Sequence, residues 1–231
     1  MADNTEQGRE LHREFVGMLF ALAIAQVAVQ SADVINHDLD AWIKAPALSH
    51  LLLAAIVIAT SWVGWGRSGH SLSPVRHVFT KDFVELLIDV GLVGVYFFIV
   101  QGAEKVVIVD GAETIQASAA HEALWVMVMF AMYLLWDIFT KWGLWKDLGQ
   151  KIWGSILCAG LAWWAFCAIQ GLRGTVPVLW GDLSLLCLVL LFRATKLRDL
   201  FQHTRGTWAG IICLTIAWGA STLVAVRTSI P

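Results

Sequence analysis

The stretch FVELLIDVGLVGVYFFIVQ, residues 83–101, decides the fold, because apolar residues occupy nearly all of its positions. About 20 consecutive, mainly apolar residues carry a helix across the hydrocarbon core of a bilayer. A soluble chain this apolar would expose large sticky patches, whereas lipid accepts such a surface. The stretch therefore predicts a transmembrane helix, and its few polar residues become candidates for function.

Six other apolar stretches of similar length occur along the chain, at residues 15–35, 46–65, 120–140, 152–171, 176–193 and 207–226. The chain of 231 residues is 58% hydrophobic and 15% charged, whereas a soluble domain carries about 25% charged residues. Pro46 and Pro177 stand at expected helix starts, where a missing N–H costs no hydrogen bond. We therefore predict an all-α integral membrane protein with about seven transmembrane helices, in which residues 15–226 form a single transmembrane domain.

The lysines and arginines between the expected helices predict the orientation of the chain. Ten of them lie in the loops after the second, fourth and sixth stretches, and three lie in the opposite loops. Cytoplasmic loops carry an excess of Lys and Arg. Residues 1–14 are therefore expected to be a cytoplasmic N-terminal segment, and residues 227–231 an external C-terminal tail. The expected location is a bacterial inner membrane or a plasma membrane.

The three basic loops share a short pattern, a base followed by Asp and an apolar residue, close to the start of the next helix. The triplets are Lys81-Asp82-Phe83, Lys146-Asp147-Leu148 and Arg198-Asp199-Leu200. This pattern predicts one leading helix followed by three hairpins of the same orientation. The alternative needs no repetition, because Asp favours helix N-caps and bases favour the cytoplasmic interface.

The sharpest chemical feature is a row of acids at the helix expected over residues 83–101. Asp82, Glu85 and Asp89 are spaced i, i+3 and i+7, which places them on one helical face. An acid inside a membrane helix costs about 3 kcal/mol unless it is paired, hydrated or protonated, so it is a functional candidate. The face therefore predicts a cation path or a proton relay.

The alternative for these acids is a structural network, in which bases reaching inward from helix ends neutralise them. The candidate bases are Lys81, Lys141 and Arg193. Asp82 itself is expected to be a helix N-cap. Asp137 belongs to the candidate relay, but Lys141 follows it by four residues, the favourable order for a helical salt bridge.

The remaining ionisable residues of the outer half carry no recognisable motif. Asp182 has Arg173 as a candidate partner. His37, His50 and His121 lie at outer helix ends, where paired histidines can hold haem or a metal or sense external pH. No ligand-like spacing relates them, so we expect interface histidines without a function. We expect no cofactor, no metal and no enzyme, because no phosphate loop, nucleophile elbow or HExxH motif occurs.

We therefore favour a membrane channel or transporter for a small cation, with protons as the first candidate, built around Glu85, Asp89, Asp82 and Asp137. The alternative is a non-enzymatic sensor, scaffold or effector subunit that acts through its basic loops or by forming homo-oligomers. The residues expected to contact anionic lipid headgroups or a protein partner are Lys196, Arg198 and Arg205. A net charge of −2 gives no reason to expect a nucleic-acid partner.

Overall fold

The computed structural model describes residues 2–68, 80–101, 106–109, 112–115, 119–141, 148–196 and 204–229. This part of the chain forms long helices and one short hairpin. The helices are α1 (Ala2–Asn36), α2 (Ala41–Ser68), α3 (Lys81–Gln101), α4 (Ala119–Lys141), α5 (Leu148–Ile169), α6 (Thr175–Thr195) and α7 (Arg205–Ser229). The hairpin pairs β1 (Val106–Val109) antiparallel with β2 (Ala112–Ile115).

All seven helices of the described residues are long and apolar enough to cross a bilayer, which confirms the predicted number of long apolar helices. Large apolar side chains also cover their outer surface. Trp62, Trp163 and Trp164 each expose more than half of their surface. Such a surface promotes aggregation in water, whereas lipid accepts it. The structure is therefore compatible with a multi-pass membrane protein, and its orientation in the bilayer stays a prediction.

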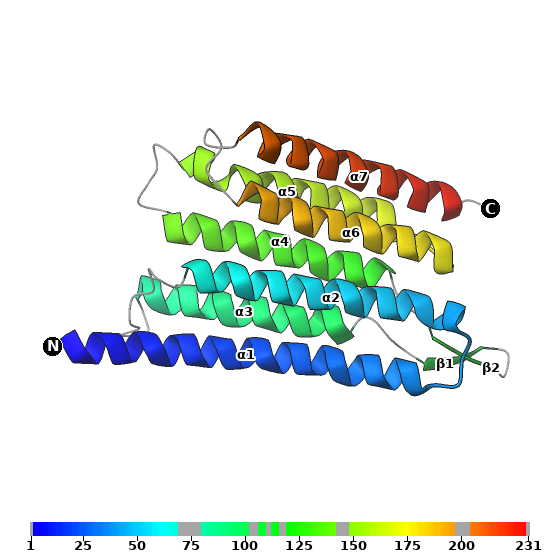
Figure 1. Ribbon diagram of the computed structural model, residues 1–231, viewed down its shortest axis with the longest axis horizontal. Coiled ribbons are helices and arrows are strands. Elements are labelled where there is room, and N and C mark those ends of the chain that lie inside the picture. The colour runs from blue at the N-terminus through cyan, green and yellow to red at the C-terminus, as the bar shows by residue number, and fades with distance from the viewer. Residues whose placement is uncertain are drawn as a thin grey trace.

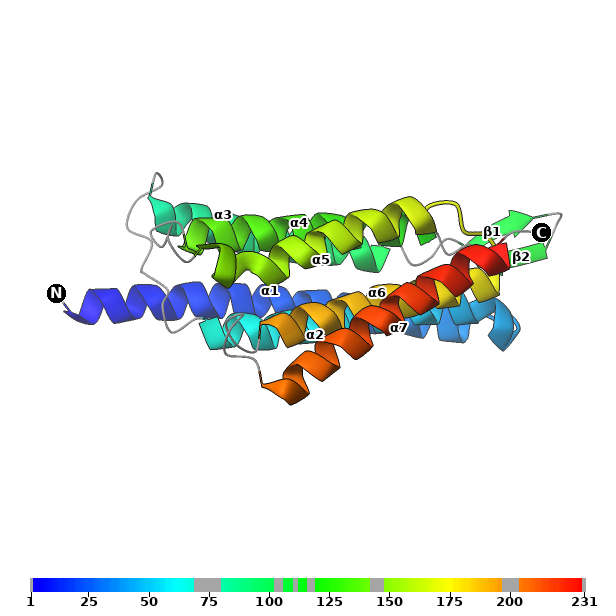
Figure 2. The same cartoon turned by 90° about the horizontal axis from the view of Figure 1, so that it is seen from above.

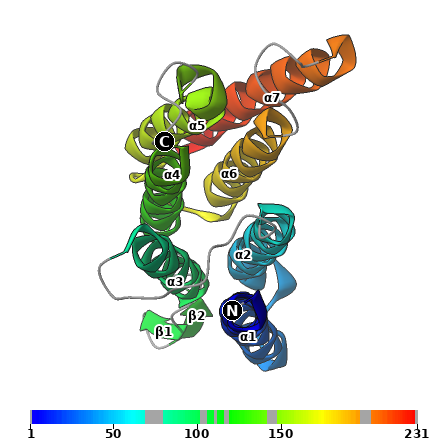
Figure 3. The ribbon, with the colours of Figure 1, turned by 90° about the vertical axis from the view of Figure 1, so that its left-hand side faces the viewer.

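The helices alternate in direction, so that the two termini lie at opposite ends of the molecule (Figure 1). They form two layers, with α1, α2, α6 and α7 in one and α3, α4 and α5 in the other (Figures 2 and 3). We call the end with the N-terminus the basic end, because the helix ends next to the sequence segments rich in Lys and Arg lie there. The opposite end, where β1 and β2 lie, is the hairpin end.

α2 begins earlier than the sequence predicts, and the cause is a local cap. The Asp40 carboxylate accepts a hydrogen bond from the Trp42 backbone N–H at 2.7 Å. This bond satisfies one of the N–H groups that a helix start leaves without a partner. The helix therefore starts at Ala41, and Pro46 lies inside it rather than at its start.

The start of α3 corrects a second prediction. The helix begins at Lys81, and the Thr80 hydroxyl accepts a hydrogen bond from the Phe83 backbone N–H at 3.4 Å. Thr80 therefore holds the N-cap position, and Asp82 is the second residue of the helix. The prediction that Asp82 is the N-cap is wrong.

Two further elements depart from the predicted outline. α1 begins at Ala2, so residues that were expected to precede the first helix belong to it. The β1–β2 hairpin between α3 and α4 was not predicted, because the sequence was interpreted as all-α. Neither element changes the number of spans.

α6 is the most enclosed helix. In its most apolar stretch 61% of the residues are buried, the largest share among the seven described helices. It packs against α2 and α5, and its Ser184 hydroxyl lies 2.5 Å from the Thr222 hydroxyl of α7. Polar residues on α6 therefore lie inside the bundle, where Asp182 and Arg193 become the centres of two polar layers.

Candidate functional site

Two polar layers lie at the same spacing on α2, α4 and α6. Each helix contributes one residue to each layer, and the two residues are 11 positions apart in every case. The pairs are His50 and Ser61 on α2, Glu122 and Tyr133 on α4, and Asp182 and Arg193 on α6. Eleven residues make about three helical turns and rise about 16 Å, so both members of a pair lie on one face of their helix.

Arg193 is the centre of the layer near the basic end. Its Nη2 donates hydrogen bonds to Ser61 Oγ at 2.8 Å and to the Tyr133 hydroxyl at 3.2 Å. Its Cζ lies 5.5 Å from the centroid of the Tyr133 ring and 5.4 Å from that of Phe192, within cation–π range. Gly64 lets the guanidinium approach α2 closely, because a Cβ there would lie 2.6 Å from Nη1.

A chain of hydroxyl groups holds Arg193 in place. The Ser61 hydroxyl donates to the Val57 carbonyl at 2.6 Å, so Ser61 Oγ accepts from Tyr133, which it contacts directly. Tyr133 has then used its one proton, and its oxygen accepts from the Tyr96 hydroxyl at 2.9 Å. Both oxygens that bind Arg193 are therefore neutral hydroxyl oxygens with fixed donor directions.

The positive charge of Arg193 has no carboxylate partner among the described residues. Its Nε is buried without a hydrogen-bond partner in that part of the chain. The sequence pointed to Arg193 as a base that neutralises the helix acids. The structure joins it to hydroxyl groups instead, and a charge in this state inside a candidate membrane span is a candidate functional residue.

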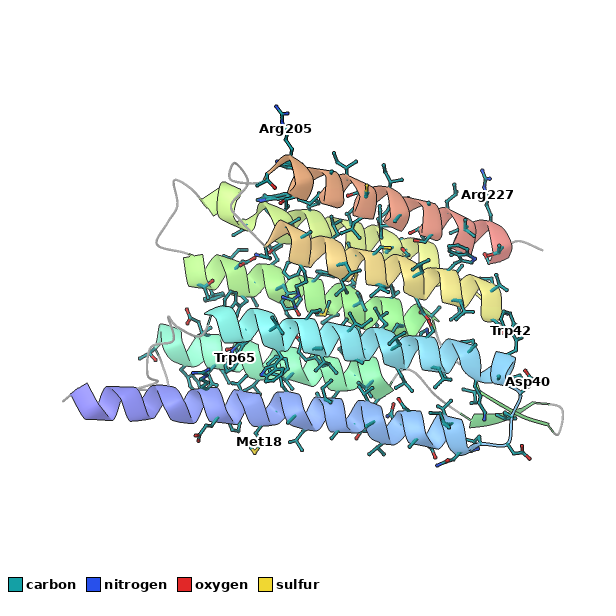
Figure 4. The ribbon with its side chains drawn as sticks, viewed as in Figure 1. Met18, Asp40, Trp42, Trp65, Arg205 and Arg227 are labelled. Carbon is teal, nitrogen blue, oxygen red and sulfur yellow. The ribbon has the colours of Figure 1, made fainter. Side chains whose placement is uncertain are left out.

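The Arg193 side chain lines a cavity of about 670 Å³ between the two helix layers. Aromatic residues form much of its wall, among them Phe20, Trp65, Tyr96 and Trp136. Figure 4 shows the Trp65 side chain among the helices rather than on the outer surface. Sites for small organic molecules have volumes of about 300–1,000 Å³ and mainly apolar walls with a few polar groups. The cavity fits that description.

Two of the predicted relay acids, Asp89 and Asp137, line the same cavity. Asp89 is 4% exposed and accepts a hydrogen bond from Trp65 Nε1 at 3.2 Å. Asp137 accepts hydrogen bonds from the ammonium of Lys196, the C-cap of α6, and from the Ser155 hydroxyl of α5. Lys196 was expected to contact lipid or a protein partner; its ammonium reaches inward to Asp137, and the external contact stays a prediction.

The other predicted residues are less informative. Glu85 is half-buried on α3 and is not among the residues that line the cavity. The side chains of Lys81, Asp82 and Lys141, and all of Arg198, lie outside the described part of the structure, so their roles stay predictions. Arg205 is exposed at the start of α7 and projects away from the helices (Figure 4).

The second polar layer lies nearer the hairpin end. His50 Nε2 is 2.9 Å from Asp182 Oδ1, an ion-pair distance, and His50 is fully buried. His50 was expected at the membrane interface; the structure buries it among the helices, and its depth in the bilayer stays a prediction. Asp182 contacts His50, whereas its candidate partner Arg173 is exposed. Glu122 is also fully buried, and neither of its carboxylate oxygens has a hydrogen-bond partner among the described residues.

Sequence reasoning missed several residues of these layers. Ser61, Tyr96, Tyr133 and Glu122 were not identified as candidates. The sequence held one signal for the two tyrosines. The chain contains only two, and they are hydrogen-bonded to each other beside Arg193. A polar residue type that is rare in the chain and lies inside apolar stretches is a candidate for a specific contact.

Comparisons of this chain with protein-family models, with curated proteins and with solved structures find no match.

Proposed function

We propose that this chain is a membrane carrier that binds a small organic anion in the Arg193 cavity. One observation supports the proposal above all: a guanidinium inside a membrane span donates to two hydroxyls and to no carboxylate in the described structure. Its Nη1 group donates no hydrogen bond to the described residues and remains to donate to a ligand. Arg is the side chain best suited to bind a carboxylate, sulfonate or phosphate group.

The charges around the cavity favour an anion over the cation predicted from the sequence. Asp137 already accepts from an ammonium and a hydroxyl, and Asp89 accepts from Trp65. A cation in the cavity would meet these occupied carboxylates and the repulsion of Arg193. The aromatic wall adds apolar surface for the body of an organic ligand.

The closure of the cavity toward the hairpin end favours a carrier over an open channel. Beyond the Arg193 layer, α2, α4 and α6 present fully or almost fully buried apolar residues, including Ile58, Phe130 and Leu188. Alternating access requires such a seal on one side of a central site.

Three probes of similar shape and different charge test the proposal: benzenesulfonate, benzyltrimethylammonium and benzyl alcohol. The first two keep their charge at every working pH. We expect benzenesulfonate to raise the melting temperature of the purified protein, and the other two to leave it nearly unchanged. Arg193→Gln should lose the response, whereas Arg227→Gln should keep it, because Arg227 is exposed on α7 and projects away from the helices (Figure 4).

Stabilisation by benzyltrimethylammonium but not by benzenesulfonate would restore the cation prediction. An unchanged response in Arg193→Gln would place the anion elsewhere. Uptake of labelled benzenesulfonate by liposomes that contain the protein tests the transport step. Binding without uptake would favour the alternative of a membrane sensor.

A further inference from the structure

The layer of His50, Glu122 and Asp182 contains an unbalanced charge. His50 and Asp182 form an ion pair that is neutral as a unit when the histidine is protonated. Glu122 adds a carboxylate that is fully buried, and both of its oxygens lack a hydrogen-bond partner in the described structure. A buried carboxylate without donors is strongly unfavourable, and such a group takes up a proton instead.

No other charged side chain that the structure describes acts on this carboxylate. The groups that act on Glu122 electrostatically are His50 and Asp182. The other ionisable residues near this end whose burial the structure describes are exposed or half-buried: Asp33 of α1, His37, Asp38 and Asp40 between α1 and α2, Lys44 of α2, His121 of α4, Arg173 after α5 and Arg227 of α7. The spans of α3 and α5 bring no charged residue to this depth.

We propose that His50, Glu122 and Asp182 form a proton-binding site, with the exchangeable proton on Glu122. Asp182 Oδ2 also lacks a hydrogen-bond partner in the described structure, and we assign it as the acceptor for the Glu122 proton. A proton suits the site better than a metal ion, because no three ligand residues of the described chain converge as a metal site requires.

The position of this site suggests how proton binding is coupled to the Arg193 layer. The same three helices hold the proton site and the Arg193 layer, separated by 11 residues on each helix. Buried apolar residues such as Val57, Met129 and Leu185 lie between them. A change of helix packing at one layer therefore reaches the other, and the proton serves as the coupling ion of transport. The coupling rests on the proposed function, whereas the proton site does not.

Infrared spectroscopy of the purified protein tests the proton site without any ligand. We expect the carbonyl stretch of a protonated carboxylic acid at neutral pH, shifted by exchange into D₂O and lost on titration to alkaline pH. Glu122→Gln should remove this band, and Glu14→Gln, at an exposed carboxylate of α1, should leave it unchanged. Because the wild-type spectrum needs no variant, a folding defect in Glu122→Gln does not prevent the test.

A wild-type spectrum without this band, or a band that survives Glu122→Gln, would overturn the proton site. Stabilisation of the wild type by sodium chloride, but not by choline chloride at equal concentration, would also overturn it, in favour of a cation site. For the coupling, we expect an inward proton gradient to accelerate benzenesulfonate uptake into liposomes several-fold, with this acceleration lost in Glu122→Gln. The infrared band without benzenesulfonate binding would refute the proposed function and leave the proton site standing.

Discussion

Gly64→Ala tests whether Arg193 is held against α2 as the proposed anion site requires. The new Cβ would lie 2.6 Å from Arg193 Nη1, and relieving the contact to 3.4 Å moves the guanidinium by about 0.8 Å away from α2. Ser61 lies on the same helix, one turn earlier. The shift therefore stretches the bond from Nη2 to Ser61 Oγ from 2.8 Å to about 3.6 Å, beyond hydrogen-bond range.

Two effects of opposite sign then set the change in stability. Loss of a hydrogen bond from a charged donor costs about 1.5–3 kcal/mol. Replacement of Gly by Ala inside a helix stabilises by about 1 kcal/mol. Gly64→Ala should therefore lower the free energy of unfolding by about 0.5–2 kcal/mol. Gly66→Ala is the matched control on the same helix, because its Cβ would meet nothing within 4 Å and only the second effect remains.

The assay is unfolding in mixed micelles with increasing SDS, followed by tryptophan fluorescence, for each alanine variant with and without Arg193→Gln. If the contact with Arg193 causes the loss of stability, Gly64→Ala should be neutral or stabilising in the Arg193→Gln background. Its effect there should equal that of Gly66→Ala. This double-mutant cycle isolates the pair. An equal loss of stability in both backgrounds would refute the reasoning, since the clash would then involve another group.

Two other predictions concern the packing and the orientation of the helices. Gly154→Ala on α5 would place a Cβ 2.6 Å from the Cβ of Thr195 on α6, so the free energy of unfolding should fall by about 1–3 kcal/mol in a melt. Gly160→Ala on α5, whose Cβ would meet nothing within 4 Å, is the control and should be neutral or stabilising. Equal effects of the two substitutions would contradict the α5–α6 contact. In a variant without the four native cysteines, a single cysteine within residues 197–203 should escape an impermeant maleimide on intact cells, while Thr114→Cys should react. Labelling of both would contradict the alternating topology.

The apolar stretches alone were enough to predict the seven long apolar helices, because each stretch by itself has the length and composition that a bilayer requires. The same property revealed part of the site. A charge inside an apolar stretch is visible in the sequence, and three of the charged residues identified in this way, Asp89, Asp137 and Arg193, line the cavity. These three residues lie close together because each is near the end of its helix that faces the basic end.

Partners across helices were not predictable, because they depend on which helices are neighbours in space. α6 lies beside α2, which brings Arg193 to Ser61 across 132 positions of sequence. Glu122 escaped notice because an acid near a helix start is ordinary in sequence, where it complements the helix dipole. The hairpin was missed although the dipeptide Asp110-Gly111 between its strands is a strong turn signal.

The two polar layers carry opposite unbalanced charges, and distance prevents them from compensating each other. The attraction between unit charges about 16 Å apart, at an effective dielectric constant of about 20, amounts to about 1 kcal/mol. Burial of either charge alone costs several kcal/mol. Each layer therefore needs a compensating charge of its own, which the proposed mechanism supplies as an anion at Arg193 and a proton at Glu122. In the proposed mechanism one monovalent anion and one proton together carry no net charge, so the membrane potential would do no work on the transport step.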